Sequence, residues 1–252
     1  MNYCRFLHNG QVKYGRVDDS RVIELAGSFF EDESHVPTDQ VHNLNEVKLL
    51  APVEPKQVVA IGLNYSDHAK EQNKTLPEEP MMFMVSPSAV IGPEEKIELA
   101  RDHHRIEYEA ELAIVIGKEA YRVKQEEASD YIFGYTCAND VSDRDLQKKD
   151  SQFTRAKSFK TYKPVGPWIS TSVQPKQLSI SLKQNGELKQ NGNTEDMIHS
   201  VHKIIETVTE VMTLYPGDII LTGTPAGVGQ LKSEDNIEVS IEGIGRLKNT
   251  VL

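Results

Sequence analysis

The stretch Ile106-Glu-Tyr-Glu-Ala-Glu-Leu-Ala-Ile-Val-Ile-Gly117 decides the fold, because its hydrophobic pattern has a period of two. Its even positions are apolar throughout, whereas its first three odd positions hold Glu107, Glu109 and Glu111. Successive side chains of a β-strand point to opposite faces, so this alternation predicts a strand with one apolar face and one acidic face.

Three glutamates on one strand face need a compensating interaction. Carboxylates two positions apart repel each other, and glutamate has little preference for strands. A divalent cation held by carboxylate oxygens would offset that repulsion. The alternative is a solvated edge strand, whose glutamates discourage pairing with other strands. The strand alone leaves both interpretations open.

Length and composition indicate a globular protein that does not bind nucleic acid or membranes. The 252 residues suffice for one large domain, with or without a small appendage. The net charge is −10 and no basic run is interleaved with aromatic residues, which argues against nucleic-acid binding. No apolar run approaches the roughly 20 residues that span a bilayer, and the N-terminus lacks a signal-peptide core. Cys4 and Cys137 match no thiolate metal pattern, so we expect a reducing, cytoplasmic location.

The first 52 residues form a predicted small β-rich domain. Two apolar runs flank Asn9-Gly10, a strong hairpin signal, and a third strand is expected over Arg21–Leu25. The run Ala51–Pro55 contains two prolines, which favour an extended connector. We therefore divide the chain into residues 1–52 and 53–252.

The remainder of the chain mixes short strands with few helices. A second hairpin is predicted at Asn185-Gly186, and one long amphipathic helix is predicted over 196–214. Shorter helices are expected over Asp67–Asn73, capped by Ser66, over Lys124–Asp130, and after a capping Ser142. This order does not fit a doubly wound sheet, so the predicted class is mixed α/β and β-rich.

Three carboxylates are candidate metal ligands. Glu109 and Glu111 share a strand face and lie about 7 Å apart at Cα, so both can reach one ion. Asp140 follows the apolar strand predicted over Tyr131–Asn139, and a carboxylate at a strand end faces a cleft more often than a core. Such a set suits Mg²⁺ or Mn²⁺, with positions left for a substrate, better than zinc, because no His or Cys joins it.

His68 and Glu71 are a candidate proton-transfer pair. They stand three residues apart on a predicted helix and therefore face the same way. A carboxylate beside an imidazole orients the ring and raises its basicity. The alternative is an exposed helix with incidental charges.

Further polar residues lie after these motifs. Arg144 is expected either to bind a substrate carboxylate or to pair with Asp145 or a nearby glutamate, and Gln147 lies one turn further on. Lys157 would be stabilised near acidic groups. The loop Thr222–Gly229 is rich in glycine and small hydroxyls, so its backbone N–H groups can approach an anion closely.

From about residue 53 to the C-terminus the chain resembles the fumarylacetoacetate hydrolase superfamily. Each motif is weak alone, but the ordered set is specific. In chain order the motifs are Ile61-Gly62-Leu63-Asn64-Tyr65 with His68-x-x-Glu71, Tyr108-Glu109-x-Glu111-Leu112, Gly134-Tyr135-Thr136, Asn139-Asp140-Val141-Ser142-x-Arg144-Asp145-x-Gln147, Ala156-Lys157-Ser158-Phe159, Gly166-Pro167-Trp168, Pro216-Gly217-Asp218 and Thr222-Gly223-Thr224-Pro225-Ala226-Gly227-Val228-Gly229.

The resemblance implies a β-rich fold with a rolled mixed β-sheet core, usually assembled as a homodimer. It also implies roles for the candidate residues. These are Mg²⁺ or Mn²⁺ on Glu109, Glu111 and Asp140, a base dyad of His68 and Glu71 on a mobile lid, Lys157 as a cationic partner, and Thr224 near the substrate's oxygen atoms. Two positions depart from the superfamily's pattern, since Val85 stands where many members carry lysine and Lys160 where many carry an acidic residue.

The activity that the resemblance implies is cleavage of a C–C bond in small 2-oxo or diketo acids. The reaction would be acylpyruvate-type hydrolysis or oxaloacetate-type decarboxylation through a metal-bound enolate. One alternative is an isomerase or decarboxylase of hydroxymuconate-type diacids in aromatic catabolism. A non-enzymatic alternative is a metal-stabilised ligand-binding protein without turnover.

Overall fold

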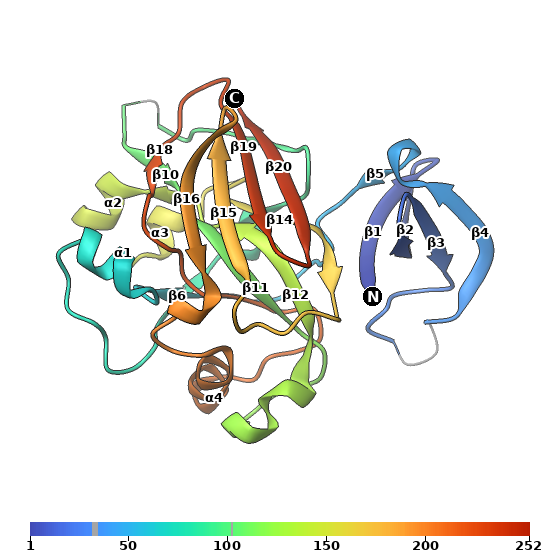
Figure 1. Cartoon of the computed structure of the whole chain (residues 1–252), viewed down its shortest axis with the longest axis horizontal. Helices are drawn as coiled ribbons and strands as arrows, with labels where there is room; N and C mark the ends of the chain where they lie inside the picture. Colours follow the sequence, from blue (N-terminus) through green and yellow to red (C-terminus); the bar gives the residue numbers. More distant parts are fainter. Residues whose placement is uncertain (32–34, 102) are drawn as a thin grey trace.

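The computed structural model describes residues 1–31, 35–101 and 103–252, and its largest element is one twelve-stranded mixed sheet. Its strands run in the order β4-β3-β2-β1-β14-β12-β11-β17-β6-β7, with β5 beside β1 and β8 beside β14 (Figure 1). The pairs β6–β17 and β8–β14 are parallel, and the other pairs are antiparallel. The bounds are β1 Asn2–His8, β2 Gln11–Asp18, β3 Arg21–Leu25, β4 Pro37–Asn43, β5 Lys48–Leu49, β6 Val58–Gly62, β7 Met81–Val85, β8 Val90–Ile91, β11 Ala110–Ile116, β12 Ile132–Asn139, β14 Lys163–Ser170 and β17 Ile219–Leu221. This confirms a β-rich fold around a mixed sheet.

Two smaller sheets complete the strands. One has the order β16-β15-β19-β20-β9 and the other β13-β10-β18. Asn185-Gly186 joins β15 to β16 and Asn9-Gly10 joins β1 to β2, all four residues with positive φ, so both predicted hairpins are confirmed. The bounds are β9 Lys96–Ile97, β10 Ile106–Tyr108, β13 Ser142–Asp143, β15 Ser179–Gln184, β16 Glu187–Asn193, β18 Gly229–Gln230, β19 Asn236–Ile241 and β20 Gly245–Val251.

The stretch that decides the fold becomes two strands, β10 and β11, which are separated at Glu109. Its even positions, such as Leu112, pack in the main hydrophobic core against residues of β15, β19 and β20. Its later odd positions, Ala113 and Val115, enter a second apolar cluster on the opposite face. Every residue of both strands is buried, so the predicted two faces are confirmed and the solvated edge strand is wrong.

The helices are few and short. They are α1 Ser66–Glu71, α2 Arg144–Lys149, α3 Thr154–Lys157 and α4 Val201–Val211, with 3₁₀ turns η1 Leu44–Glu46, η2 Pro87–Ala89, η3 Gln125–Tyr131 and η4 Thr194–Asp196. The helix predicted over 196–214 is shorter, because Ser200 caps α4 through the N–H of Lys203 and the preceding Ile198 bonds to Asn64. The predicted helix over Lys124–Asp130 is the 3₁₀ turn η3.

Two predicted caps are also wrong. Asp143, not Ser142, caps α2 by accepting from the N–H of Leu146 at 3.0 Å. Ser66 is the first residue of α1 rather than its cap. A carboxylate accepts this bond as well as a hydroxyl does, so spacing alone did not distinguish Ser142 from its neighbour.

The N-terminal strands β2 to β4 lie at one side of the molecule (Figure 1), and β1 joins them to the rest of the twelve-stranded sheet through β14. Tyr3 of β1 pairs with Ile169 of β14, while Cys4, Phe6 and Val22 form a small core of their own. The division after residue 52 stays a prediction. Cys4 and Cys137 are both free thiols, and both are buried. In the described chain, no helix has the length and apolar character needed to cross a bilayer.

Candidate functional site

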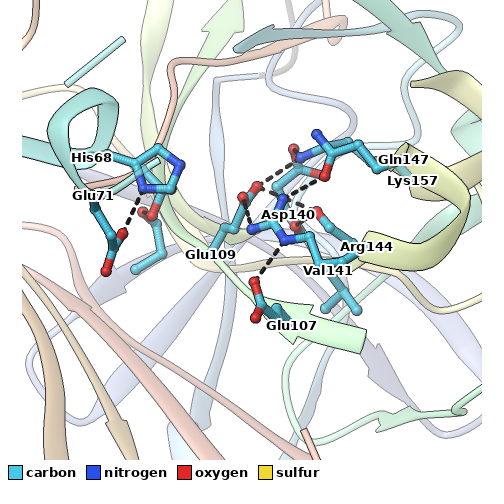
Figure 2. Close-up of polar contacts among 12 residues, drawn as sticks. His68, Glu71, Glu107, Glu109, Asp140, Val141, Arg144, Gln147 and Lys157 are labelled. Atoms are coloured by element: carbon cyan, nitrogen blue, oxygen red, sulfur yellow. Dashed lines mark hydrogen bonds and ion pairs between the residues drawn. The ribbon is translucent and has the colours of Figure 1, made fainter. Parts of the chain in front are cut away.

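A cavity of about 450 Å³ lies where α1, α2 and α3 meet the acidic stretch of β10 and β11. Figure 2 shows His68 and Glu71 on one side of Glu109, with Arg144, Gln147 and Lys157 on the other side. Eight of the nine predicted site residues line this cavity, namely His68, Glu71, Glu109, Glu111, Arg144, Gln147, Lys157 and Thr224. The ninth, Asp140, joins them through Lys157.

The three predicted metal ligands converge. One carboxylate oxygen each from Glu109, Glu111 and Asp140 lies within 4.8 Å of the others, and all three residues are buried. Antiparallel pairing of β11 with β12 sets Ala110 opposite Asn139. Glu109, which precedes Ala110, therefore lies close to Asp140, which follows Asn139. The N–H of Asp140 donates to the carbonyl of Glu109 at 2.9 Å, which fixes that junction.

Two buried lysines compensate this acidic cluster. Lys157, at the end of α3, places Nζ 2.7 Å from Glu109 Oε2 and 2.5 Å from Asp140 Oδ2. Lys163, the first residue of β14, places Nζ 2.7 Å from Asp140 Oδ1 and donates to the carbonyls of Val141 and Tyr162. Asp140 therefore lies between two ammonium groups.

The environment moves the two glutamate pKa values in opposite directions. Burial favours the protonated form of both carboxyls. At Glu109 the positive charges of Arg144 and Lys157 outweigh burial, so its pKa lies well below the usual range. At Glu111 burial acts together with the negative charges of Asp140 and Glu109, so its pKa is raised. Of the two glutamates, Glu111 is thus the one whose charge the protein compensates less.

Arg144 adopts one of its two predicted roles. Its Nε donates to Glu107 Oε2 at 2.6 Å and its Nη2 to Glu109 Oε1 at 2.5 Å, while Nη1 donates to Gln147 Oε1 at 2.6 Å. Glu107 is buried and also pairs with Arg105, so it is a support for Arg144 rather than a solvated residue. Arg144 lines the cavity even though glutamates hold it.

The predicted pair on α1 is formed. His68 Nδ1 lies 2.9 Å from Glu71 Oε2, which leaves Nε2 of the buried imidazole for other partners. The other oxygen of Glu71 accepts from the N–H of Gly227 at 3.0 Å, and Asp67 Oδ2 accepts from the N–H of Ala226 at 3.2 Å. The loop 222–229 therefore holds α1 in place, and the interpretation of His68 and Glu71 as incidental charges is wrong.

The same loop contacts the carboxylates with its backbone. The N–H of Gly223 donates to Glu111 Oε2 at 2.7 Å. Gly223 has φ +94°, and an added Cβ would lie 2.8 Å from the Cβ of Asn64, so both backbone and space demand glycine. Thr224 Oγ1 donates to the carbonyl of Ala110 and accepts from Gln190 Nε2, both at 2.8 Å.

Two contributions were missed from the sequence: Lys163 and Gln190. A lysine within the apolar run Tyr162-Lys163-Pro164-Val165 was a signal for the first, because a buried lysine needs a paired carboxylate. Gln190 lies in a hairpin strand of polar residues and offered no such signal. The two departures from the superfamily's pattern lie outside the cavity, Val85 in the apolar core and Lys160 exposed beside Glu98.

The donor set fits a hard divalent cation. It offers three carboxylates and open space on the cavity side, which suits Mg²⁺ or Mn²⁺. Asp140 Oδ1 is buried and accepts no directed hydrogen bond in the described chain, although Lys163 lies close to it. Burial and the neighbouring Asp140 and Glu109 disfavour the ionised form of Glu111 and raise its pKa, so a cation at this place would favour its ionisation.

Comparison with known proteins identifies relatives over the whole chain. Oxaloacetate tautomerase YisK of Bacillus subtilis is 42% identical over 237 residues, which cover 85% of this chain and 78% of that protein. The crystal structure of 2-hydroxyhepta-2,4-diene-1,7-dioate isomerase from Mycobacterium marinum superposes with a TM-score of 0.92 at 40% identity, covering 100% of this chain and 98% of that one. Maleylpyruvate hydrolase from Sphingobium sp. SYK-6, solved with manganese(II) and pyruvate, gives a TM-score of 0.84 at 29% identity, covering 100% and 99%.

Family models account for both parts of the sequence. Residues 1–52 match the family described as Rv2993c-like, N-terminal. Residues 57–252 match the family described as fumarylacetoacetate (FAA) hydrolase C-terminal, whose named members among these relatives are enzymes. The chain thus belongs to the fumarylacetoacetate hydrolase C-terminal domain family.

Proposed function

We propose that this chain is a divalent-metal-dependent enzyme that cleaves a C–C bond of small 2-oxo or diketo acids. The observation that carries the proposal is the convergence of Glu109, Glu111 and Asp140 beside a cavity with the His68–Glu71 pair at its other side. The Sphingobium relative, a maleylpyruvate hydrolase solved with manganese and pyruvate, supports both the metal and the substrate class.

Glu109, Glu111 and Asp140 would hold Mg²⁺ or Mn²⁺. Such an ion supplies Lewis-acid chemistry, because it binds the carboxylate and 2-oxo oxygens of a substrate and stabilises negative charge that develops on them. The neighbouring cations Lys157 and Arg144 add positive charge at the same wall of the cavity. They favour binding of an anionic substrate in the orientation that directs its reacting carbon toward α1.

His68 moves the proton. Because Glu71 Oε2 accepts from Nδ1, the imidazole carries its lone pair on Nε2, which is the atom able to take a proton. In hydrolysis His68 would take the proton of a water that attacks the distal carbonyl, and it would then return a proton to the carbon that leaves. Glu71 stabilises the imidazolium formed in between. In decarboxylation no water attacks, so His68 Nε2 would first take a proton from solvent and then deliver it to the carbon that CO₂ has left.

A second candidate is a tautomerase or isomerase that uses the same residues. The observation that favours it is the identity of 42% to a protein named oxaloacetate tautomerase, together with the isomerase named for the structure at TM-score 0.92. In that reaction His68 would remove a proton from one carbon or oxygen and return it to another, with no carbon–carbon bond broken. The hydroxymuconate-type diacids belong to this alternative.

A substrate panel tests the proposal. The purified protein, loaded with Mg²⁺ or Mn²⁺, is incubated with oxaloacetate, with acylpyruvates and with a hydroxymuconate-type diene, and pyruvate, CO₂ and enol or diene absorbance are read separately. Release of pyruvate from an acylpyruvate or of CO₂ from oxaloacetate, abolished by EDTA, is expected. An absorbance change without fragmentation would identify the tautomerase or isomerase instead. No turnover on any compound, with metal binding unchanged in Glu109→Gln, would refute the proposal.

The proposal includes a homodimer, a cytoplasmic location and a separate N-terminal domain of residues 1–52. Light scattering after size exclusion tests the first. Expression of residues 53–252 tests the third, since a domain with its own core should fold and keep its metal site without the N-terminal strands. Such a truncation removes the pairing of β1 with β14 and the packing of Tyr3 and Phe29 on Phe133.

A further inference from the structure

Each of the three carboxylates has one oxygen in contact with an N–H or a cation other than Lys157. Arg144 Nη2 holds Glu109 Oε1 at 2.5 Å, and the N–H of Gly223 holds Glu111 Oε2 at 2.7 Å. Lys163 Nζ lies 2.7 Å from Asp140 Oδ1 as an ion pair. The remaining oxygens are Glu109 Oε2, Glu111 Oε1 and Asp140 Oδ2, and the first of these also accepts a long hydrogen bond from Ser142 Oγ at 3.4 Å.

Lys157 indicates where two of these oxygens lie. Its ammonium contacts Glu109 Oε2 and Asp140 Oδ2 together, so both point to one place on the cavity side. Within the described chain, no donor reaches Glu111 Oε1. The protein thus presents three single oxygens rather than three carboxylates that are free to chelate through both.

Lys163 is the group that contacts Asp140 Oδ1. It is completely buried, and its two hydrogen bonds go to the carbonyls of Val141 and Tyr162, so its position is fixed by the backbone on either side of Asp140. It does not line the cavity and has no direct path to a substrate. A buried cation held at this distance competes with a metal for Oδ1.

We infer that Lys163 is a positioning residue that makes Asp140 a one-oxygen ligand and thereby selects Mg²⁺ or Mn²⁺ against Ca²⁺. The inference rests on the proposed metal site. Mg²⁺ requires near-octahedral coordination at about 2.0–2.1 Å and takes single carboxylate oxygens, whereas Ca²⁺ accepts about 6–8 oxygens and often binds a carboxylate through both. Freeing Asp140 Oδ1 therefore favours the larger ion.

The test compares Mn²⁺ and Ca²⁺ affinities, measured by titration calorimetry, for the full-length protein and for Lys163→Met. Loss of one nearby positive charge strengthens binding of both ions alike, so the ratio of their affinities isolates the effect on coordination. We expect this ratio to move toward Ca²⁺ by about tenfold, the lower end for residues that orient metal ligands. Lys160→Met is the matched control, because Lys160 lies three positions before Lys163 and is exposed. It should leave the ratio unchanged.

An unchanged ratio in Lys163→Met, with both affinities altered equally, would overturn the inference and leave the proposed function intact. Failure of the unsubstituted protein to bind either ion would instead refute the proposed metal site, and the inference with it. If Lys163→Met does not fold, a crystal structure of the unsubstituted protein with Mn²⁺ decides. Asp140 bound through Oδ2 alone, with Lys163 still on Oδ1, supports the inference, and binding through both oxygens contradicts it.

Discussion

Lys157 Nζ lies 2.5 Å from Asp140 Oδ2, in a position where it also contacts Glu109 Oε2 at 2.7 Å. The ammonium thus compensates two buried carboxylates that would otherwise repel each other. A metal that binds the same oxygens has to displace Lys157 from at least one of them. The displaced ammonium stays at the cavity wall, where it can pair with an anionic substrate.

Replacing Lys157 should therefore make the fold depend on metal. Lys157→Met leaves two buried carboxylates without their shared partner, and removing one member of a buried ion pair costs about 3–5 kcal/mol. Urea unfolding in EDTA should show that loss, and Mn²⁺ should restore much of it, because the metal supplies the missing positive charge. Lys160→Met should behave as the unsubstituted protein does, since that side chain is exposed. Equal loss of stability with and without Mn²⁺ would show that Lys157 acts through packing alone.

The two metal-ligand glutamates should respond in opposite ways to neutralisation. The pKa of Glu111 is raised by burial and by Asp140 and Glu109, so its charge opposes folding when no metal is present. Glu111→Gln should stabilise the metal-free protein, because it removes a charge that burial and two neighbouring carboxylates disfavour. Glu109→Gln should destabilise it, because Arg144 and Lys157 each lose one of their two carboxylate partners.

Both substitutions should remove stabilisation by Mn²⁺. A ligand at about 100 times its Kd stabilises a protein by about 2.7 kcal/mol, and thermal unfolding with and without Mn²⁺ measures this difference. If Glu111→Gln and Glu109→Gln change the unfolding free energy in EDTA in the same direction, the two carboxylates are not compensated unequally.

His68 and Glu71 should affect turnover without affecting metal binding. His68→Gln removes the proton acceptor, and such losses are about 10²–10⁴-fold in kcat. Glu71→Gln keeps the shape but weakens the partner of Nδ1, so a smaller loss is expected, with the pH optimum of kcat displaced. The Mn²⁺ affinity of both variants should equal that of the unsubstituted protein, because neither residue is among the three converging carboxylates. A parallel loss of affinity would place His68 in the metal site instead.

The sequence predicted the site better than the elements that carry it. The period of two across Glu107, Glu109 and Glu111 predicted which side chains share a face, because that depends only on strand geometry. It did not predict the interruption at Glu109, which follows from a tertiary contact: the N–H of Glu109 donates to Asn139 Oδ1 instead of to a neighbouring strand. The superfamily's motifs supplied Asp140 and Lys157, which lie 29 and 46 positions beyond Glu111.

The features that were not predicted from the sequence depend on contacts between residues far apart in the chain. The helix predicted over 196–214 begins only at Val201, since Asn64 bonds to the backbone of both Ile198 and His199 and holds that segment extended. The apolar pattern reflects burial on both sides of Ser200, and burial alone does not distinguish a helix from an extended segment. Lys163 was missed for the same reason, because its partner Asp140 precedes it by 23 positions.

The same segment gives the fold an acid-sensitive contact at His199. Burial lowers the pKa of His199 below its usual 6.5, and this effect outweighs the hydrogen bond to the carbonyl of Pro77, which raises the pKa. Of the nearby charged groups, Lys203 lowers the pKa and Glu79 raises it. Below pH 6.5 the unfolded chain binds a proton that the folded chain takes up less readily, so the unfolding free energy should fall as pH falls; above that pH this contribution is fully present.

His199→Gln should flatten this part of the pH dependence. Urea unfolding at pH 5.0, 6.0 and 7.5 measures it, and the difference between the unsubstituted protein and the variant should grow toward pH 5. His202→Gln is the matched control, because His202 lies on α4 with its ring bonded to Ser129 and should leave the slope in place. A slope that persists in His199→Gln would assign the acid sensitivity to another group. Because Asn64 joins the segment of His199 to the end of β6, just before α1, protection of the α1 amides should follow the same pH profile.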